Sequence, residues 1–218
     1  MSIESAVADG SVAIISEEHG YVIKREGTGC SRAEKILSVI AGVLDEAGMT
    51  GRDLDLIAVS TGPGSYSGIR IGMSTAIGLG NALGLRCSGV SVLEAMAFCA
   101  VVQDPFVAAV PVGKTDVAWQ LFETRKDGVR RAVNDPEVSS SSRFVEDLAR
   151  VSGVIIFAQT ELLTRVVGEL PPTTVCLDAG IGLAEFVGRF ASSTNQSGAS
   201  LRPIYLRNRD ATMRPAAF

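Results

Sequence analysis

A glycine-rich segment at residues 60–72, STGPGSYSGIRIG, is the part of the chain whose composition best fits chemistry on a bound ligand. It follows a predicted strand and precedes a predicted helix, where free backbone N–H groups and the helix dipole attract an anion. Three known patterns do not match it. A Walker loop ends in Gly-Lys-Ser/Thr, a dinucleotide fingerprint requires glycine where Ser67 stands, and a nucleophile elbow requires serine where Tyr66 stands.

We therefore interpret this segment mainly as a tight structural turn. Its glycines permit a positive φ, and Ser67 is placed to cap the helix that follows. The alternative is that the turn contacts a nucleotide, in which case the contacting residues would be Gly62, Gly64 and Ser65.

Other side chains capable of chemistry are few and far apart in the sequence. His19 is the only histidine and lies in a predicted hairpin turn, so Ser-His-Asp catalysis or a histidine-rich metal site would have no other imidazole. We interpret His19 as a solvated turn residue. The four cysteines form no Cys-x-x-Cys pair, which indicates free thiols in a reducing compartment. We expect Asp53, Asp55 and Asp116 to be strand-end or turn carboxylates, and we predict no catalytic and no metal-binding residue.

The first half of the chain predicts a hairpin followed by alternating helices and strands. Residues 11–16 and 21–25 alternate as antiparallel strands do, whereas the evidence for an earlier strand is thin. A capping box at Ser31 and Glu34 opens a helix that ends at Gly48. The elements that follow are a strand at 54–60, a helix at 68–83, a strand at 86–90 and a helix at 91–102.

The second half repeats this order of elements. The predicted elements are strands at 106–112, 116–123 and 129–133, a serine-rich cap at 139–142, a helix at 143–151, a strand at 154–158, a helix from Glu161, a strand at 173–178 and a helix at 183–191. Each half therefore reads βββαβαβα, with a mixed sheet covered by helices. Two such halves predict an α/β protein of the two-lobed actin-like ATPase (ASKHA) fold, with an N-terminal lobe at 1–103 and a C-terminal lobe at 104–218.

Composition limits the partners and the compartment. The 218 residues are 46% hydrophobic, with a mean hydropathy of +0.28. The longest apolar run, residues 95–102, is nevertheless far shorter than the roughly 18 residues of a membrane span. The N-terminus lacks the basic segment of a secretory signal, so we expect a cytoplasmic protein. The net charge of −4 provides no positive field for nucleic acid, so any RNA would be held mainly by another molecule.

Two predicted helices carry unusual surfaces. On residues 31–48 the apolar positions cover an arc of about 200°, whereas a helix packed on one core commonly needs about 100°. On residues 68–84 small side chains recur every four residues and form a ridge that permits a close approach. The residues alone leave open whether this ridge meets its own sheet or another molecule.

The run at residues 60–95, STGPGSYSGIRIGMSTAIGLGNALGLRCSGVSVLEA, resembles the TsaB (YeaZ) family. The family pattern is approximately GPGSFTGLRIG, then a small-residue helix, then GVSSLEALA, and PIYLR at 203–207 resembles the family's C-terminal P-x-YLR. Two departures stand out. The first strand is short, with Glu4 about where the family has its acid, and Arg32 or Ala33 stands where the family often has histidine.

The resemblance implies a non-catalytic pseudo-enzyme in tRNA processing. Such a protein supports the catalytic subunit TsaD in making threonylcarbamoyladenosine, is engaged by the small ATPase TsaE, forms a homodimer when alone, and meets tRNA only through the complex. It has no cofactor of its own, although ATP or another nucleotide can bind the assembled complex. The resemblance also implies that the two helices form a four-helix junction with the partner, at Ile36, Ile40, Val43, Leu44, Ile69, Gly72, Met73, Ala76 and Gly80.

Two other functions stay open. The chain could be a self-associating actin-like homodimer module with another partner, which the helix surfaces alone allow. It could also be an active actin-like phosphotransferase or a glycoprotease-like peptidase, which would require a carboxylate-held metal and an intact first strand. Co-purification with a TsaD-type subunit discriminates among these functions.

Overall fold

The computed structural model describes residues 1–16, 20–24, 33–102, 105–126, 128–149, 155–168, 170, 175–179, 182–194 and 201–206. The chain divides into two compact units. Unit 1 consists of Met1–Cys99 and Ile181–Ile204, and unit 2 of Ala100–Gly180 and Tyr205–Phe218. The predicted lobe boundary after residue 103 lies within a few residues of the first change of unit, whereas the change near residue 181 departs from the prediction.

Unit 1 contains a mixed five-stranded sheet. Its strands are β1 (Ser2–Glu4), β2 (Ser11–Ser16), β3 (Gly20–Lys24), β4 (Leu56–Gly62) and β5 (Arg86–Ser91). In space their order is β3-β2-β1-β4-β5, with antiparallel pairing on the β2 side of β1 and parallel pairing on the β4 side. The three-residue β1, for which the sequence offers little signal, is therefore the central strand.

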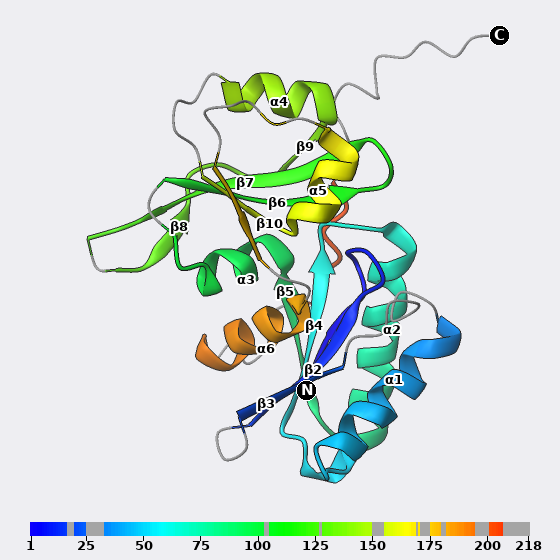
Figure 1. The fold of residues 1–218 in the computed structure, drawn as a ribbon. Helices are drawn as coiled ribbons and strands as arrows, with labels where there is room; N and C mark the ends of the chain where they lie inside the picture. Colours follow the sequence, from blue (N-terminus) through cyan, green and yellow to red (C-terminus); the bar gives the residue numbers. More distant parts are fainter. Residues whose placement is uncertain are drawn as a thin grey trace, which may run out of the picture. The chain divides into compact units, whose positions relative to one another are not determined.

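Helices cover both faces of this sheet (Figure 1). One face carries α1 (Ala33–Glu46) and α2 (Tyr66–Leu83), and the other carries α3 (Val92–Cys99) and α6 (Leu183–Ser193). The alternation of side chains along β4 produces the two layers. Val59 faces Gly72 of α2, whereas Ala58 packs in a cluster with Val187 of α6. A short 3₁₀ turn at Gly51–Asp53 leads into β4.

Unit 2 repeats the strand order of unit 1. Its elements are β6 (Phe106–Val112), β7 (Asp116–Thr124), β8 (Arg130–Ala132), β9 (Glu137–Ser140), α4 (Ser141–Ala149), β10 (Ile155–Ala158), α5 (Thr160–Val167) and β11 (Val175–Asp178). The path β8-β7-β6-β10-β11 has the same antiparallel and parallel pairs as β3-β2-β1-β4-β5. The expectation that the two halves share one strand topology is confirmed.

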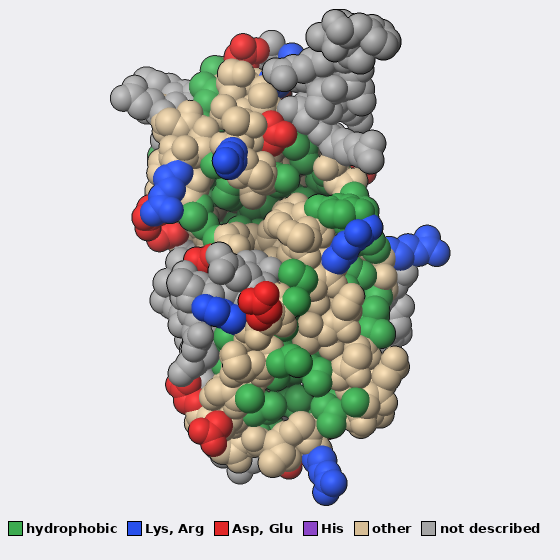
Figure 2. Space-filling view, turned by 90° about the vertical axis from the view of Figure 1, so that its right-hand side faces the viewer, with side chains coloured by type: hydrophobic (Ala, Val, Ile, Leu, Met, Phe, Trp, Pro, Cys, Tyr) green, Lys and Arg blue, Asp and Glu red, His purple; other side chains and the backbone are tan. Residues whose placement is uncertain are grey.

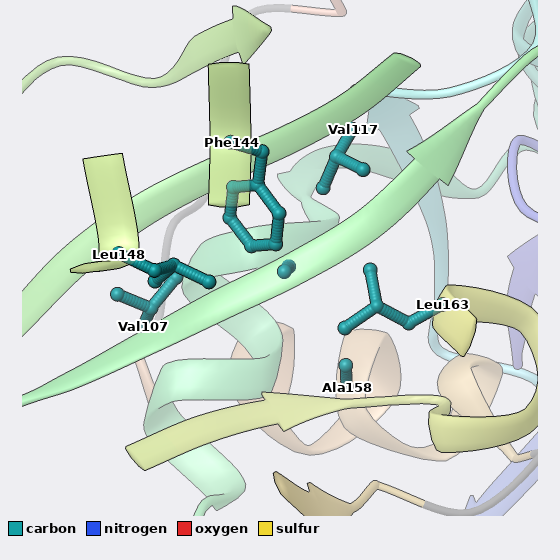
Figure 3. Close-up of a cluster of buried hydrophobic side chains, with 7 residues drawn as sticks. Val107, Val117, Phe144, Leu148, Ala158 and Leu163 are labelled. Carbon is teal, nitrogen blue, oxygen red and sulfur yellow. The ribbon is translucent and has the colours of Figure 1, made fainter. Parts of the chain in front are cut away.

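The core of unit 2 lies between this sheet and the two helices α4 and α5. Phe144 and Leu148 project from α4 toward β6 and β7, and Leu163 of α5 lies on Ala158 of β10 (Figure 3). The buried cluster is completed by Val107, Ala109 and Val117.

Two predicted elements of the second half are corrected by the structure. The helix expected at 183–191 in the C-terminal lobe is α6 of unit 1, where Val187 and Ala191 pack with Ala58. Hydrogen bonds fix it there, because Ser2 Oγ donates to the Ala184 carbonyl at 2.7 Å. The serine-rich segment is not only a helix cap, since β9 pairs with β7 before α4 begins.

Some sequence predictions lie outside the described residues. They are the hairpin turn at His19, the capping serine at residue 31 and Cys30. Among the described residues, no helix is both long and apolar enough to span a lipid bilayer.

Candidate functional site

The glycine-rich turn is packed tightly inside unit 1. Gly62 has a φ of 104°, and a Cβ built on it would lie 2.9 Å from the carbonyl oxygen of Ile204. A Cβ on Gly64 would lie 2.3 Å from the carbonyl oxygen of Ala6. Ile204 also donates its backbone N–H to the Thr61 carbonyl at 2.7 Å. The turn is therefore held between the segment after β1 and the segment at residues 201–206.

Two backbone donors of this turn have partners within the chain. Ser65 N–H donates to the Ala6 carbonyl at 2.7 Å, and Gly68 N–H donates to Ser65 Oγ at 3.3 Å. Ser65, not Ser67, is therefore the N-cap of α2, which corrects the sequence expectation. Of the three residues assigned to a nucleotide in the alternative, Gly64 and Ser65 contact Ala6 after β1, and Gly62 packs against Ile69 and Ile204. These contacts favour the structural interpretation.

A buried carboxyl group lies where β1 ends. Glu4 is only 1% exposed, and its Oε1 accepts the backbone N–H groups of Ala6 at 2.6 Å and Val7 at 3.0 Å. The Ser60 hydroxyl donates to the same oxygen at 3.3 Å. Burial raises the pKa of Glu4 to about 7, and the three hydrogen bonds oppose that rise. Glu4 thus ties the segment after β1 to the end of β4.

The small-residue ridge of α2 faces inward. A Cβ on Gly68 would lie 2.0 Å from the Ser5 carbonyl oxygen, one on Gly72 would lie 2.2 Å from Ser5 Oγ, and one on Gly80 would lie 2.5 Å from Cys87 Sγ. The ridge lets α2 lie close to β1 and β5 of its own unit.

Most of the predicted interface residues therefore lie in the interior of unit 1. Leu44 is half-buried, and the others are buried in unit 1: Ile36, Ile40, Val43, Ile69, Gly72, Met73, Ala76 and Gly80. Two parts of the helix argument hold. The helices α1 and α2 contact each other, and part of the wide apolar arc of α1 is exposed.

Part of the opposite surface of these helices is exposed and consists of uncharged residues. We call Leu37, Ala41, Ser74, Ile77 and Gly78 the outer face of α1 and α2. Leu37 is 56% exposed and Ile77 is 41% exposed. Viewed from the side of α1 and α2, hydrophobic side chains gather among neutral ones over these helices, with charged groups toward the edges (Figure 2).

The sequence contained a signal for this face. Arg70 is the only charged residue of the 18-residue α2, and its guanidinium lies 4.0 Å from the centre of the Tyr66 ring. A solvent-facing helix normally carries more charge on its polar side. The glycine spacing points instead to the other side of the helix, so Ile77 is not among the predicted interface residues.

The remaining candidate side chains lie apart from this face. Asp53 Oδ2 accepts from the Thr50 hydroxyl and from the Thr50 backbone N–H, both at 2.7 Å, and both bonds lower the pKa of Asp53. The bond from the backbone N–H is part of a capping box. Burial raises the pKa of Cys99 to about 11, so this thiol is a poor nucleophile. Among the described residues, no group of three or more His, Cys, Asp or Glu side chains is arranged to hold a metal ion.

Comparisons with known proteins place this geometry in context. The TsaD family model, tRNA N6-adenosine threonylcarbamoyltransferase, matches residues 28–182. An uncharacterized protein of Mycobacterium tuberculosis is 32% identical over 98 residues, which are 44% of this chain and 46% of that protein. This chain thus matches about half the length of that relative. The tRNA threonylcarbamoyladenosine biosynthesis protein TsaB of Escherichia coli is 25% identical over 235 aligned residues, covering 95% of this chain and 94% of that protein.

Two solved structures from Pseudomonas aeruginosa resemble the chain over most of its length. YeaZ gives a TM-score of 0.70 at 21% identity, covering 94% of this chain and 98% of that chain. An uncharacterized protein similar to the peptidase YeaZ gives a TM-score of 0.71 at 24% identity, with the same coverage. This likeness concerns the fold, and it confirms the α/β, actin-like expectation.

Proposed function

Because the chain belongs to the TsaD family, and within it to the TsaB (YeaZ) proteins, we propose that it takes part in tRNA threonylcarbamoyladenosine biosynthesis as a non-catalytic subunit. Its role is to bind and support a TsaD-type catalytic subunit. The E. coli relative matched over nearly its whole length is a biosynthesis protein of this pathway by name. The packing inside unit 1 favours a non-catalytic role, because residues of the chain itself occupy the space around the glycine-rich turn.

The observation that carries the proposal is the outer face of α1 and α2. Leu37 and Ile77 are exposed on neighbouring helices, and no charged side chain of α2 other than Arg70 interrupts the surface. Depletion of charge with exposed aliphatic side chains is typical of the centre of a protein interface. Two helices presented in this way can pack against two helices of a partner.

The other components of the reaction belong to the assembled complex in this proposal. A TsaE-type ATPase engages the pair, and ATP or another nucleotide binds where the subunits and TsaE come together. The tRNA is held mainly by the partners, since this chain has a net charge of −4. The chain needs no cofactor of its own.

The test is capture of the catalytic subunit by variants of the outer face. In Leu37→Glu/Ile77→Glu, two carboxylates would be buried without partners at the contact, so capture of the TsaD-type subunit from the same organism should fall at least about tenfold. Val133→Glu is the matched control, because Val133 of unit 2 is 51% exposed and should be neutral. Co-purification and light scattering measure both effects.

Two outcomes would contradict the proposal at different points. Undiminished capture by the folded double variant would mean that another surface binds the partner. Failure of the unaltered chain to capture the TsaD-type subunit, together with a dimer that the double variant disrupts, would leave the self-associating module instead.

A further inference from the structure

Unit 2 contains an apolar cavity between α4 and the sheet. Its volume is about 250 Å³, and its walls are formed mainly by Val107 of β6, Trp119 and Leu121 of β7, and Phe144 and Leu148 of α4. Phe144 and Leu148 project from α4, and Leu148 lies next to Val107 (Figure 3). The cavity is partly open to solvent, so a small molecule can enter it without unfolding the core.

The polar groups on the wall are already paired with protein atoms. Trp119 Nε1 donates to Ser139 Oγ at 3.2 Å, and Asn134 Oδ1 accepts the backbone N–H of Leu121 at 2.8 Å. Asp147 forms an ion pair with Arg143 at 3.2 Å. A guest in the cavity would therefore meet apolar carbon and aromatic ring surface, and a charged or strongly polar guest would lose its hydration without a partner.

We propose that this cavity binds a small, uncharged, flat aromatic molecule. An apolar cavity of about 150 Å³ is enough to hold benzene, so this one has room for a substituted ring. The rings of Trp119 and Phe144, with centroids 6.1 Å apart and planes inclined by 50°, offer aromatic surface to such a guest. This site lies within unit 2 and is independent of the outer face of α1 and α2.

Trp119 provides a direct readout, because it is the only tryptophan of the chain. Iodobenzene is a suitable probe, since a bound iodine atom quenches tryptophan fluorescence. We expect saturable quenching at one site per chain, with a Kd of about 0.1–1 mM. Potassium iodide, an ionic quencher of surface tryptophan, should give only linear quenching. Nuclear Overhauser contacts from the probe should reach the methyl groups of Val107, Leu121 and Leu148.

Variants of matched bulk test the location. Leu121→Phe adds a ring at the cavity wall and should weaken iodobenzene binding about tenfold. Val166→Phe adds similar bulk to a half-buried residue beside the same core but off the cavity wall, and should bind like the unaltered chain. Equal binding by a folded Leu121→Phe variant would overturn the proposal.

Iodobenzene titration of the unaltered chain also tests whether the cavity binds the probe. Quenching that stays linear up to the solubility limit of iodobenzene would overturn the proposal, as would probe contacts confined to methyl groups elsewhere. These results do not require Leu121→Phe to fold.

Discussion

The buried carboxyl group of Glu4 makes the stability of unit 1 depend on pH. Its pKa is about 7 in the folded chain and 4.5 in the reference state, so folding favours the protonated form. The stabilisation is fully present below pH 4.5 and is lost as the pH rises through 7. We predict that the free energy of unfolding falls by about 3 kcal/mol between pH 4.5 and pH 8, measured by urea denaturation.

Glu4→Gln isolates this effect. The amide oxygen can still accept the N–H groups of Ala6 and Val7, but it does not ionise. In this variant the free energy of unfolding should change little between pH 4.5 and pH 8, and it should exceed that of the parent at pH 8. Glu46→Gln, an exposed position on α1, should keep the parent's pH dependence. An unchanged pH profile in Glu4→Gln would contradict the assignment.

Two glycines of α2 are predicted to respond in opposite directions. Gly68→Ala places a Cβ 2.0 Å from a backbone oxygen that cannot move away cheaply, so it should lower the unfolding free energy by about 3 kcal/mol or more. Gly78→Ala meets no atom within 4 Å and should raise it by up to about 1 kcal/mol. Thermal denaturation of both variants checks the pair, and a neutral Gly68→Ala would show that α2 lies farther from β1.

At the level of helices and strands, much of the fold follows from local patterns. The hairpins, the capped helices and the repeated order of strands are encoded in alternation, turn residues and helical spacing. The position of α6 is not encoded in this way. Its apolar face requires burial but does not specify a sheet, and the contact of Ala184 with Ser2 spans 182 positions of sequence. The three residues of β1 are too few to show a periodicity.

The direction of the α2 ridge illustrates the same limit within one helix. Small residues at four-residue spacing predict that something approaches closely, but a β-strand and a partner helix satisfy that requirement equally well. The ridge faces Ser5, whose carbonyl and hydroxyl oxygens occupy the space above Gly68 and Gly72. No local sequence pattern predicts that the segment after β1 packs against α2.

The place of α6 leads to a prediction for that helix. Val187 is fully buried against Ala58, Val90 and Ala95, so Val187→Ala should cost about 2 kcal/mol. Native-state hydrogen exchange should show faster exchange in β1 and β4, with β6 and β7 little changed. Val166→Ala, beside the unit 2 core, should give the reverse pattern. Loss of protection in β6 rather than β4 would place α6 with the other unit.

For the molecule as a whole, charge predicts weak contact with RNA. The acidic residues outnumber the basic ones, 24 to 20, so few counterions would be released on binding. We predict that the chain alone does not bind tRNA at about 10 µM in 150 mM salt. Filter binding with and without the TsaD-type subunit measures this. Micromolar, salt-sensitive binding by the chain alone would contradict it.

The insertion of residues 100–180 between two parts of unit 1 affects how the chain emerges from the ribosome. The buried surface of Ala58, Val90 and Ala95 is synthesised before residues 100–180, whereas α6, which covers it, is synthesised after them. At 5–20 residues per second, this nascent surface stays uncovered for roughly 5–20 s. Residues 100–180 can fold during that interval. The sheet of unit 1 is therefore begun first but covered only after residues 100–180 have been made, and the nascent chain should depend on chaperones until α6 emerges.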